Sequence, residues 1–323
     1  MFETIDYVQA SLYVGSGIAI GFGAIGAGFG VGFAGGMANE ALSTKPEKSS
    51  EVIKNMLVGQ AIAESAGIFA LVIAIILFFT KSAGQPPLKA WAFLGAGLSM
   101  GFAAIGSGVG AGLPAGNACV GIVRQPANSN KIMTTMLIGS AVSQTPSIFG
   151  MVIALMLLYL DLSAIPLYPG WAAMLGAGLS TGLAAIGPAI GEGLASMEAV
   201  AGVARHHETN AVTTRMMLVG LGVTESTAVY GFLISLMLLF YGFEESHTLT
   251  ASMALLGAGL CMGFGGIGPG LGEGLTAAHA LRWIARKPED TGTLSRTMLV
   301  GMAVAESTGI YSLIVALLLI VVI

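Results

Sequence analysis

Five glutamates lie inside long apolar segments of the sequence, away from most of its other charged residues: Glu64, Glu192, Glu225, Glu273 and Glu306. A carboxylate at mid-membrane depth is costly and marks a candidate functional site. The alternative, a carboxyl group that stays protonated and serves only as a hydrogen-bonding group, is disfavoured because the glutamates recur at two fixed positions of a repeat. Such carboxyl groups can bind and release a cation. They are therefore the first candidates for the chemistry of this chain.

The positions recur because the sequence repeats every 80 or 81 residues. Glu64, Gln144, Glu225 and Glu306 are separated by 80, 81 and 81 residues, and glycine-rich tracts that begin at residues 25, 105, 186 and 267 show the same spacing. We divide the chain into four copies, at residues 1–84, 85–165, 166–246 and 247–323. Each copy contains a glycine-rich apolar segment, a short polar loop and a second apolar segment rich in Leu, Ile, Met and Val.

These segments are long enough to cross a membrane as helices. The 323 residues are 55% hydrophobic and 9% charged, which indicates an integral membrane protein. We predict an all-α fold of four tandem helical hairpins, whose helices lie near residues 11–42, 51–80, 88–123, 131–160, 169–204, 211–242, 251–285 and 294–323. The recurring glycine faces predict an inner layer of first helices and an outer layer of second helices. A closed ring of several chains would satisfy every such face.

Charge predicts the orientation and limits the partners. Eleven of the 13 Lys and Arg residues lie in or beside the loops within copies, which predicts cytoplasmic loops and outward linkers and termini. The net charge of −4 gives no reason to expect nucleic acid as a partner. The first six residues include Glu3 and Asp6 and lack the basic region of a signal peptide, so the first helix is expected to stay. Glu198 and His279, near cytoplasmic helix ends, are expected to snorkel toward the interface.

Three features together resemble the c subunit of F-type ATP synthases, the rotor proteolipid, once per copy. They are the glycine tract, the RQP loop at residues 124–126 and the AESTGIY segment at residues 305–311. The resemblance implies a ring that turns against the a subunit of the stator, with ATP chemistry and central-stalk binding left to partner subunits. It implies no catalysis by this chain and no cofactor. The loop residues that would bind the stalk are Lys45, Pro46, Arg124, Gln125, Pro126, Arg205, Arg286, Lys287 and Pro288.

The resemblance also implies that Glu64, Glu225 and Glu306 carry Na⁺, or alternatively H⁺. Only copies three and four offer the several oxygen ligands that Na⁺ requires. These are Glu192, the Val223 carbonyl, Glu225, Ser226, Thr227 and Tyr230, and Glu273, the Val304 carbonyl, Glu306, Ser307, Thr308 and Tyr311. Two carboxylates with one Na⁺ leave a surplus negative charge, so one carboxyl group should hold a proton. Which neighbouring copies share each site is left open.

Copies one and two depart from this pattern. Copy one keeps Glu64 and Ser65 but has Val31 in place of the first-helix acid, which predicts weak ion binding or a proton. Gln60, one turn before Glu64, is either a substitute ligand or an ordinary interhelical hydrogen-bonding group. Copy two has Gln144 in place of the carrier glutamate. A neutral amide cannot switch its charge, so we expect copy two to carry no ion.

Two alternative functions remain. A V-type proteolipid also fuses hairpins and drops a carboxylate, although the RQP loop and the segment after Glu306 favour the F type. A secondary transporter or channel with parallel repeats would need a broken helix or a large soluble gate, and the sequence indicates neither. Ring size, the direction of operation and the presence of unfused c subunits are left open.

Overall fold

The computed structural model describes residues 7–246 and 248–321, so the acidic N-terminal segment and the last two residues lie outside it. The first helix of each copy is α1 (Tyr7–Thr44), α3 (Lys89–Arg124), α6 with α7 (Leu167–Ala184 and Ile186–Arg205) or α10 (Leu249–Arg286). The second is α2 (Ser49–Phe79), α4 with α5 (Ser129–Val142 and Thr145–Tyr159), α8 with α9 (Asn210–Thr224 and Ser226–Phe240) or α11 (Thr291–Val321). In these ranges eight spans are long and apolar enough to cross a membrane, which confirms the all-α hairpin prediction.

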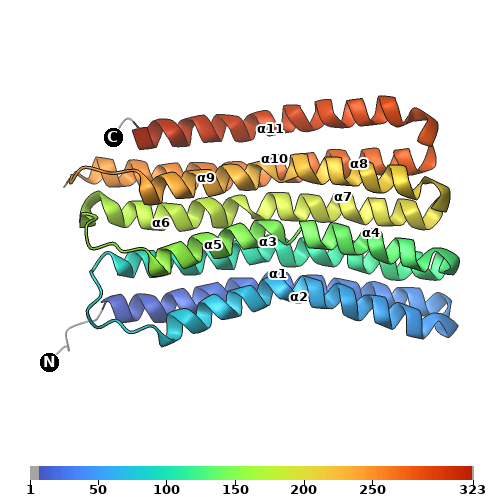
Figure 1. Ribbon diagram of the computed structural model, residues 1–323, viewed down its shortest axis with the longest axis horizontal. Coiled ribbons are helices and arrows are strands. Elements are labelled where there is room, and N and C mark those ends of the chain that lie inside the picture. Colours follow the sequence, from blue (N-terminus) through green and yellow to red (C-terminus); the bar gives the residue numbers. More distant parts are fainter. Residues whose placement is uncertain (1–6, 247, 322–323) are drawn as a thin grey trace.

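A single 3₁₀ turn closes each hairpin. The four turns are Pro46–Lys48, Pro126–Asn128, His207–Thr209 and Pro288–Asp290. Proline suits the first position of three of them because its fixed φ is compatible with the turn and its missing N–H is not needed there. The four turns lie at one end of the molecule, and the linkers and both ends of the described chain lie at the other (Figure 1). The charge pattern predicts that the basic loops and the linkers lie on opposite sides of the membrane, and this arrangement has them at opposite ends of the molecule.

Three spans are kinked, at Ser143–Gln144, Ala185 and Glu225. Proline explains two of these kinks: Pro146 and Pro188 each follow the last residue of the preceding helix by four positions, where the ring displaces that carbonyl group. No proline accounts for the kink at Glu225. The backbone stays helical at these kinks, with φ and ψ of −85° and −19° at Gln144 and of −69° and −20° at Glu225. The kinks are therefore bends and not the unwound segments of a transporter.

The helices form two layers, with the hairpins side by side in chain order (Figure 1). Each first helix packs along its length against the first helices of the neighbouring copies. In copies one to three the second helix packs against its own first helix and the first helix of the following copy, whereas α11 packs mainly against α10, and contacts between second helices are sparse. The prediction of a tight inner layer and an outer layer is confirmed. Hairpin one and hairpin four form the two open edges.

Glycine allows the inner helices to approach at backbone distance. A Cβ atom added at Gly112 on α3 would lie only 2.3 Å from the Cα of Gly30 on α1. The equivalent contacts in the next two interfaces join Gly193 to Gly110 and Gly274 to Gly191. Because the same repeat positions meet three times, each interface reproduces the previous one. The regular layer is thus a direct consequence of the regular glycine spacing.

Lys89 is the first residue of α3, and its side chain is buried with 5% exposure. Its Nζ donates hydrogen bonds to the carbonyl oxygens of Leu157 (3.3 Å) and Leu158 (2.6 Å), at the C-terminal end of α5. A cation at this end of a helix stabilises it, since the last carbonyl groups have no partner within the helix. Lys89 therefore joins the start of α3 to the end of α5, the outer helix of the same copy.

Candidate functional site: carboxyl groups between hairpins

The clearest site lies between copies three and four. The hydroxyl group of Tyr230 on α9 donates a hydrogen bond of 2.6 Å to Oε1 of Glu306 on α11. Glu306 also interacts electrostatically with Glu273 on α10, so the two acids of copy four face one site. Thr227 of copy three lies beside Gly309 of copy four. Copy three thus supplies the Tyr230 hydroxyl group to the carboxyl group of Glu306 in copy four.

Several carboxyl oxygens are buried without a donor. Among the described residues, none donates a hydrogen bond to either carboxyl oxygen of Glu192 or of Glu273, and Oε1 of Glu225 is in the same situation. A buried polar atom without a partner destabilises the structure unless something else satisfies it. A hard cation or a proton meets this need, because the available ligand atoms are oxygens. The site residues therefore fit a transported cation as substrate.

Glu225 has a different neighbour. It interacts electrostatically with Glu192 of its own copy, which repeats the pairing of Glu306 with Glu273. The copy that precedes it has Phe149 at the position of the tyrosine, and this ring stacks on Phe232 with centroids 5.3 Å apart. Tyr230, one of the predicted ligands of copy three, contacts Glu306 instead. The predicted ligands of copy three are therefore divided between two places. Glu225 lies with Glu192 of its own copy, whereas the hydroxyl group of Tyr230 lies at Glu306 of copy four.

The remaining predicted ligands of copy four lie at the open edge. Tyr311 is 63% exposed and Val304 is 67% exposed. The hydroxyl groups of Ser307 and Thr308 donate to carbonyl groups of their own helix, Ser307 to Val304 (2.7 Å) and Thr308 to Ala305 (3.0 Å). These side chains occupy the positions that, in copy three, face the following hairpin. Among the described residues, no hydrogen bond joins these side chains to a carboxyl group.

Glu64 lies at the other open edge. A groove of about 360 Å³ between α1 and α2 is lined by Glu64, Val31 and Gly28, among others. Gln60 donates a hydrogen bond of 3.0 Å to the carbonyl oxygen of Val31, and the hydroxyl group of Ser65 donates to that of Ile62 (2.7 Å). The sequence allows Gln60 to be either a substitute ligand or an interhelical hydrogen-bonding group, and its contact with Val31 matches the second interpretation. Glu64 has only the half of a site that its own copy provides.

Gln144 is held as a neutral side chain. It is 6% exposed, and its Nε2 donates a hydrogen bond of 3.1 Å to the carbonyl oxygen of Ser107 on α3. One turn earlier, the hydroxyl group of Ser140 donates to the carbonyl oxygen of Ala111 (2.9 Å), as Gln60 does in copy one. Polar groups of the outer helix thus bind backbone carbonyls in the two copies that lack a first-helix acid.

Comparison with known proteins identifies the family. The family model for the C subunit of ATP synthase matches four segments, residues 14–77, 94–157, 175–238 and 256–319, which together make up most of the chain. The chain belongs to the ATP synthase C-subunit family. It contains four family domains in tandem, and each matched segment covers both helices of one hairpin.

Two relatives show how the four domains compare with other family members. The K subunit of the A-type ATP synthase of Methanocaldococcus jannaschii is 34% identical over 226 residues, which cover 70% of this chain and 94% of that protein. The ATP synthase c subunit of Thermotoga maritima is 57% identical over 84 residues, which cover 25% of this chain and 99% of that protein. Such c and K subunits are non-catalytic rotor proteolipids. This chain is accordingly a multi-pass membrane component of an ATP synthase rotor and not an enzyme by itself.

The loop end of this rotor proteolipid contains an ion pair that sequence reasoning missed. Glu198 on α7 is 8% exposed and accepts two hydrogen bonds from the guanidinium group of Arg282 on α10. The expectation that Glu198 snorkels to the interface is therefore wrong, because a bidentate partner in the next copy satisfies it. The two residues are 84 apart, one repeat plus three, and that spacing is the signal that could have revealed the pair.

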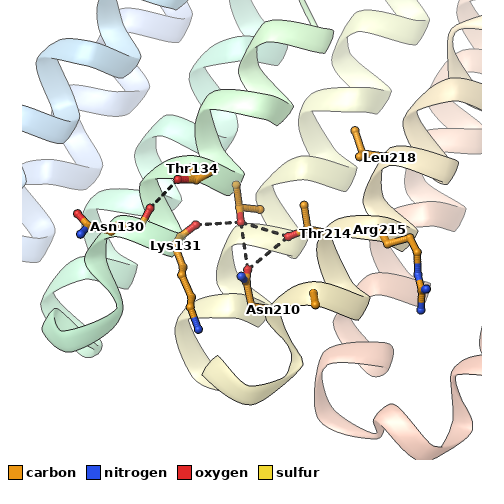
Figure 2. Close-up of a pocket in the computed structure, with 9 residues that line it drawn as sticks. Asn130, Lys131, Thr134, Asn210, Thr214, Arg215 and Leu218 are labelled. Atoms are coloured by element: carbon orange, nitrogen blue, oxygen red, sulfur yellow. Dashed lines mark hydrogen bonds between the residues drawn. The ribbon is translucent and has the colours of Figure 1, made fainter.

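A groove at the loop end of the proteolipid is not the ion site. It has a volume of about 490 Å³ and lies between α4 and α8, and Figure 2 shows its lining, which includes Lys131 and Arg215. Thr135 is within hydrogen-bonding distance of Asn210 (3.5 Å) and Thr214 (3.4 Å) there. No carboxyl side chain lines this groove. Amides, hydroxyl groups and two cations do not form a site for a transported cation.

Proposed function

We propose that this chain carries Na⁺ on Glu64, Glu225 and Glu306 while a ring of such chains rotates past the a subunit of a stator. The observation that carries the proposal is the hydrogen bond between Tyr230 of one copy and Glu306 of the next, beside a second acid whose carboxyl oxygens accept no hydrogen bond among the described residues. Each carrier then requires the hairpin before it. A proton carried on the same glutamates is the alternative within this proposal.

The open edges support a ring. Apart from the adjacent part of its own helix, no described atom lies within 4 Å of a Cβ atom added at Gly32 on α1, although the equivalent Gly112 packs on the backbone of copy one. At the other edge the same is true of Gly268 on α10, although the equivalent Gly187 packs on Ile267 of copy four. The two edges are therefore the two halves of one interface. Repeated head-to-tail contact between identical chains closes into a ring when the rotation allows it.

Charge neutrality explains how a loaded site can move through lipid. An ion pair with a cation removes the net charge that would make a carboxylate costly in the bilayer. At the pair Glu273 and Glu306, one Na⁺ and one proton together neutralise both acids. Opposite charge on the stator, such as an arginine of the a subunit, would favour the empty carboxylate and so release the cation. The loop residues would bind the central stalk on the cytoplasmic side.

The three carriers should differ in affinity. Glu306 has the Tyr230 hydroxyl group of copy three, whereas copy two has Phe149 at the equivalent position and so offers Glu225 no such hydroxyl group. Glu64 would receive Tyr311 from copy four of a neighbouring chain, because Tyr311 occupies the position of Tyr230. Gln144 should carry no ion. We therefore expect the Na⁺ affinity to be highest at Glu306.

Two observations point to different types of the complex. The RQP loop, the segment at residues 305–311 and the 57% identity of one hairpin to a bacterial ATP synthase proteolipid favour an F-type rotor. The match of 226 residues to an A-type K subunit favours a rotor whose proteolipid contains several fused hairpins. Purification of the intact complex and identification of its stalk and stator subunits would decide between them.

Carbodiimide labelling tests the ion-carrier proposal. The detergent-extracted ring is treated with a carboxyl-modifying carbodiimide in Na⁺ or K⁺ buffers, and the modified peptides are quantified by mass spectrometry. Na⁺ should slow the modification of Glu306 most strongly, and the Gln144 peptide provides the unreactive control. Equal labelling of Glu64, Glu225 and Glu306 with no effect of Na⁺ across neutral pH would contradict Na⁺ transport and favour H⁺.

A further inference from the structure

One row of positions, near the loop end of the first helices, differs in chemistry from interface to interface. Between copies one and two it is apolar, with Met37 against Gly116. Between copies two and three it is polar and neutral, with Nδ2 of Asn117 donating to the carbonyl oxygen of Met197 (3.3 Å). Between copies three and four it contains the ion pair of Glu198 and Arg282 described above.

The repeat defines which positions meet in this row. Met37, Asn117 and Glu198 occupy the same position of their copies, since they are separated by 80 and 81 residues. In each interface this residue of the preceding copy faces one turn of the first helix of the following copy. That turn runs from the repeat position of Gly116 to the repeat position of Arg282, four residues later. Three interfaces with three different chemistries obey the same rule. The rule therefore follows from the packing of the helices and not from one pair of side chains.

The same positions at the open edges are occupied by His279 and Glu40. His279 follows Glu198 by 81 residues, and Glu40 is the copy-one equivalent of Arg282. Both residues are exposed, and among the described residues neither side chain takes part in an ion pair or a hydrogen bond. An imidazole group can donate a hydrogen bond to a carboxylate, and it pairs with the carboxylate as a cation when protonated. The two edges are chemically complementary at the place where they would meet.

We infer that His279 of each chain pairs with Glu40 of the next chain where whole chains join head to tail in the ring. This inference rests on the ring assembly of the proposed function. At this junction the acid, Glu40, belongs to the following chain. Between copies three and four the acid, Glu198, belongs to the preceding copy. A copy that carried another acid at the position of His279 would place two carboxylates together, which disfavours the wrong neighbour.

The junction has a consequence for ion transport. If only whole chains enter the ring, the neutral Gln144 passes the stator at every fourth hairpin. The same contact places Tyr311 of the preceding chain at the groove that contains Glu64. The site of copy one is therefore complete only when a second chain is docked.

A charge swap between the edges tests the pairing. The variants His279→Glu, Glu40→Arg and the combined H279E/E40R are extracted in detergent, and native mass spectrometry counts the chains in each ring during heating. Each single variant should dissociate at a lower temperature than the wild type, since His279→Glu opposes two carboxylates and Glu40→Arg removes the carboxylate with which the imidazole group pairs. The combined variant recreates the Glu–Arg pair seen between copies three and four and should regain the wild-type dissociation temperature. A combined variant no more stable than the weaker single variant would overturn the inference, as would single variants that match the wild type.

Cross-linking distinguishes failure of this inference from failure of the proposed function. In the variant H279C/E40C, a short bis-maleimide should join chains into a ladder of whole-chain multiples, while H279C alone and E40C alone should give no ladder. A ring that forms in native mass spectrometry but gives no ladder would overturn the junction and leave the rotor function standing. A wild-type chain that forms no ring would overturn both.

Discussion

At the residue scale, the surroundings of each acid depend on the copy before it. Glu225 and Glu306 occupy the same repeat position and each has an acidic partner in its own copy. Only Glu306 receives a tyrosine hydroxyl group, because copy three has Tyr230 where copy two has Phe149. The properties of a proposed carrier are therefore determined across the interface between hairpins. This makes the sites separable by mutation.

Replacement of Tyr230 by Phe should weaken Na⁺ binding at Glu306 and leave Glu225 unchanged. A hydrogen bond to a charged group contributes about 1.5–3 kcal/mol, which corresponds to roughly a tenfold or greater loss of affinity. The measurement is the Na⁺ concentration that halves carbodiimide modification of each glutamate. The reciprocal variant Phe149→Tyr is the matched control, since it should strengthen protection of Glu225 only. A change at Glu225 in the Tyr230→Phe variant would show that the hydroxyl group serves copy three after all.

Replacement of Gln144 by Glu should create a proton site and not a Na⁺ site. The amide now donates to the carbonyl oxygen of Ser107, and a carboxylate cannot donate unless it is protonated. Ala111 offers no second acid, and Phe69 of copy one offers no hydroxyl group. Carbodiimide should label the new glutamate at a rate that Na⁺ does not alter. Strong protection by Na⁺ would mean that copy two can form a complete site.

At the element scale, the inner helices approach so closely that glycine is required at equivalent places in each copy. The outer helices of copies one to three lie over the grooves between them, and the outer spans of copies two and three are interrupted at Ser143–Gln144 and at Glu225. Gly112 of copy two is buried against copy one, whereas Gly32, at the same repeat position in copy one, lies at the open edge of the chain. A pair of equivalent substitutions therefore separates folding of the chain from assembly of the ring.

The substitution Gly112→Ala should destabilise the chain itself, whereas Gly32→Ala should leave the chain folded and weaken the ring. Overpacking of a close contact costs about 1–3 kcal/mol, and the added Cβ atom at Gly112 would lie 2.3 Å from Gly30. The measurements are detergent unfolding of the isolated chain and native mass spectrometry of the ring. Gly222→Ala, a position with no atom within 4 Å of an added Cβ atom, is the control and should affect neither. If Gly32→Ala left the ring as stable as the wild type, the edges would not meet through this glycine face.

At the scale of the whole molecule, four fused hairpins make the copies of a ring inequivalent in a fixed order. Three copies carry an acid at the carrier position and one carries an amide. A single chain leaves both edges open (Figure 1), so closure depends on other chains. Ring size then changes in steps of four hairpins if no other c subunit joins.

A ring of this chain alone should move three ions per chain in each turn. With fewer ions per ATP, each ion can be driven against a larger gradient, so the complex would be better suited to ATP-driven pumping than to synthesis. Reconstituted ²²Na⁺ uptake per ATP hydrolysed, combined with the number of chains from native mass spectrometry, measures the ratio. Transport of one ion for every hairpin would show that copy two is a carrier.

The sequence by itself determined the hairpin repeat, the eight spans, the two layers and the repeat position of the proposed carriers. Helix length, glycine spacing and a costly buried charge are local or periodic properties, which the order of residues encodes directly. The departure at Gln144 was visible in the same way, because an amide cannot ionise in any surroundings. The family resemblance stated from the residues was confirmed by the four matched segments.

Only the tertiary structure decided which copies share a site. Tyr230 and Glu306 are 76 residues apart, and Glu198 and Arg282 are 84 apart, on hairpins that carry almost the same pattern. Repeated sequences cannot reveal by pattern alone whether a side chain faces its own hairpin or the next, since both alternatives have the same periodicity. The packing of each outer helix into the groove beside the following copy resolves this choice. It places the Tyr230 hydroxyl group of copy three at Glu306 of copy four.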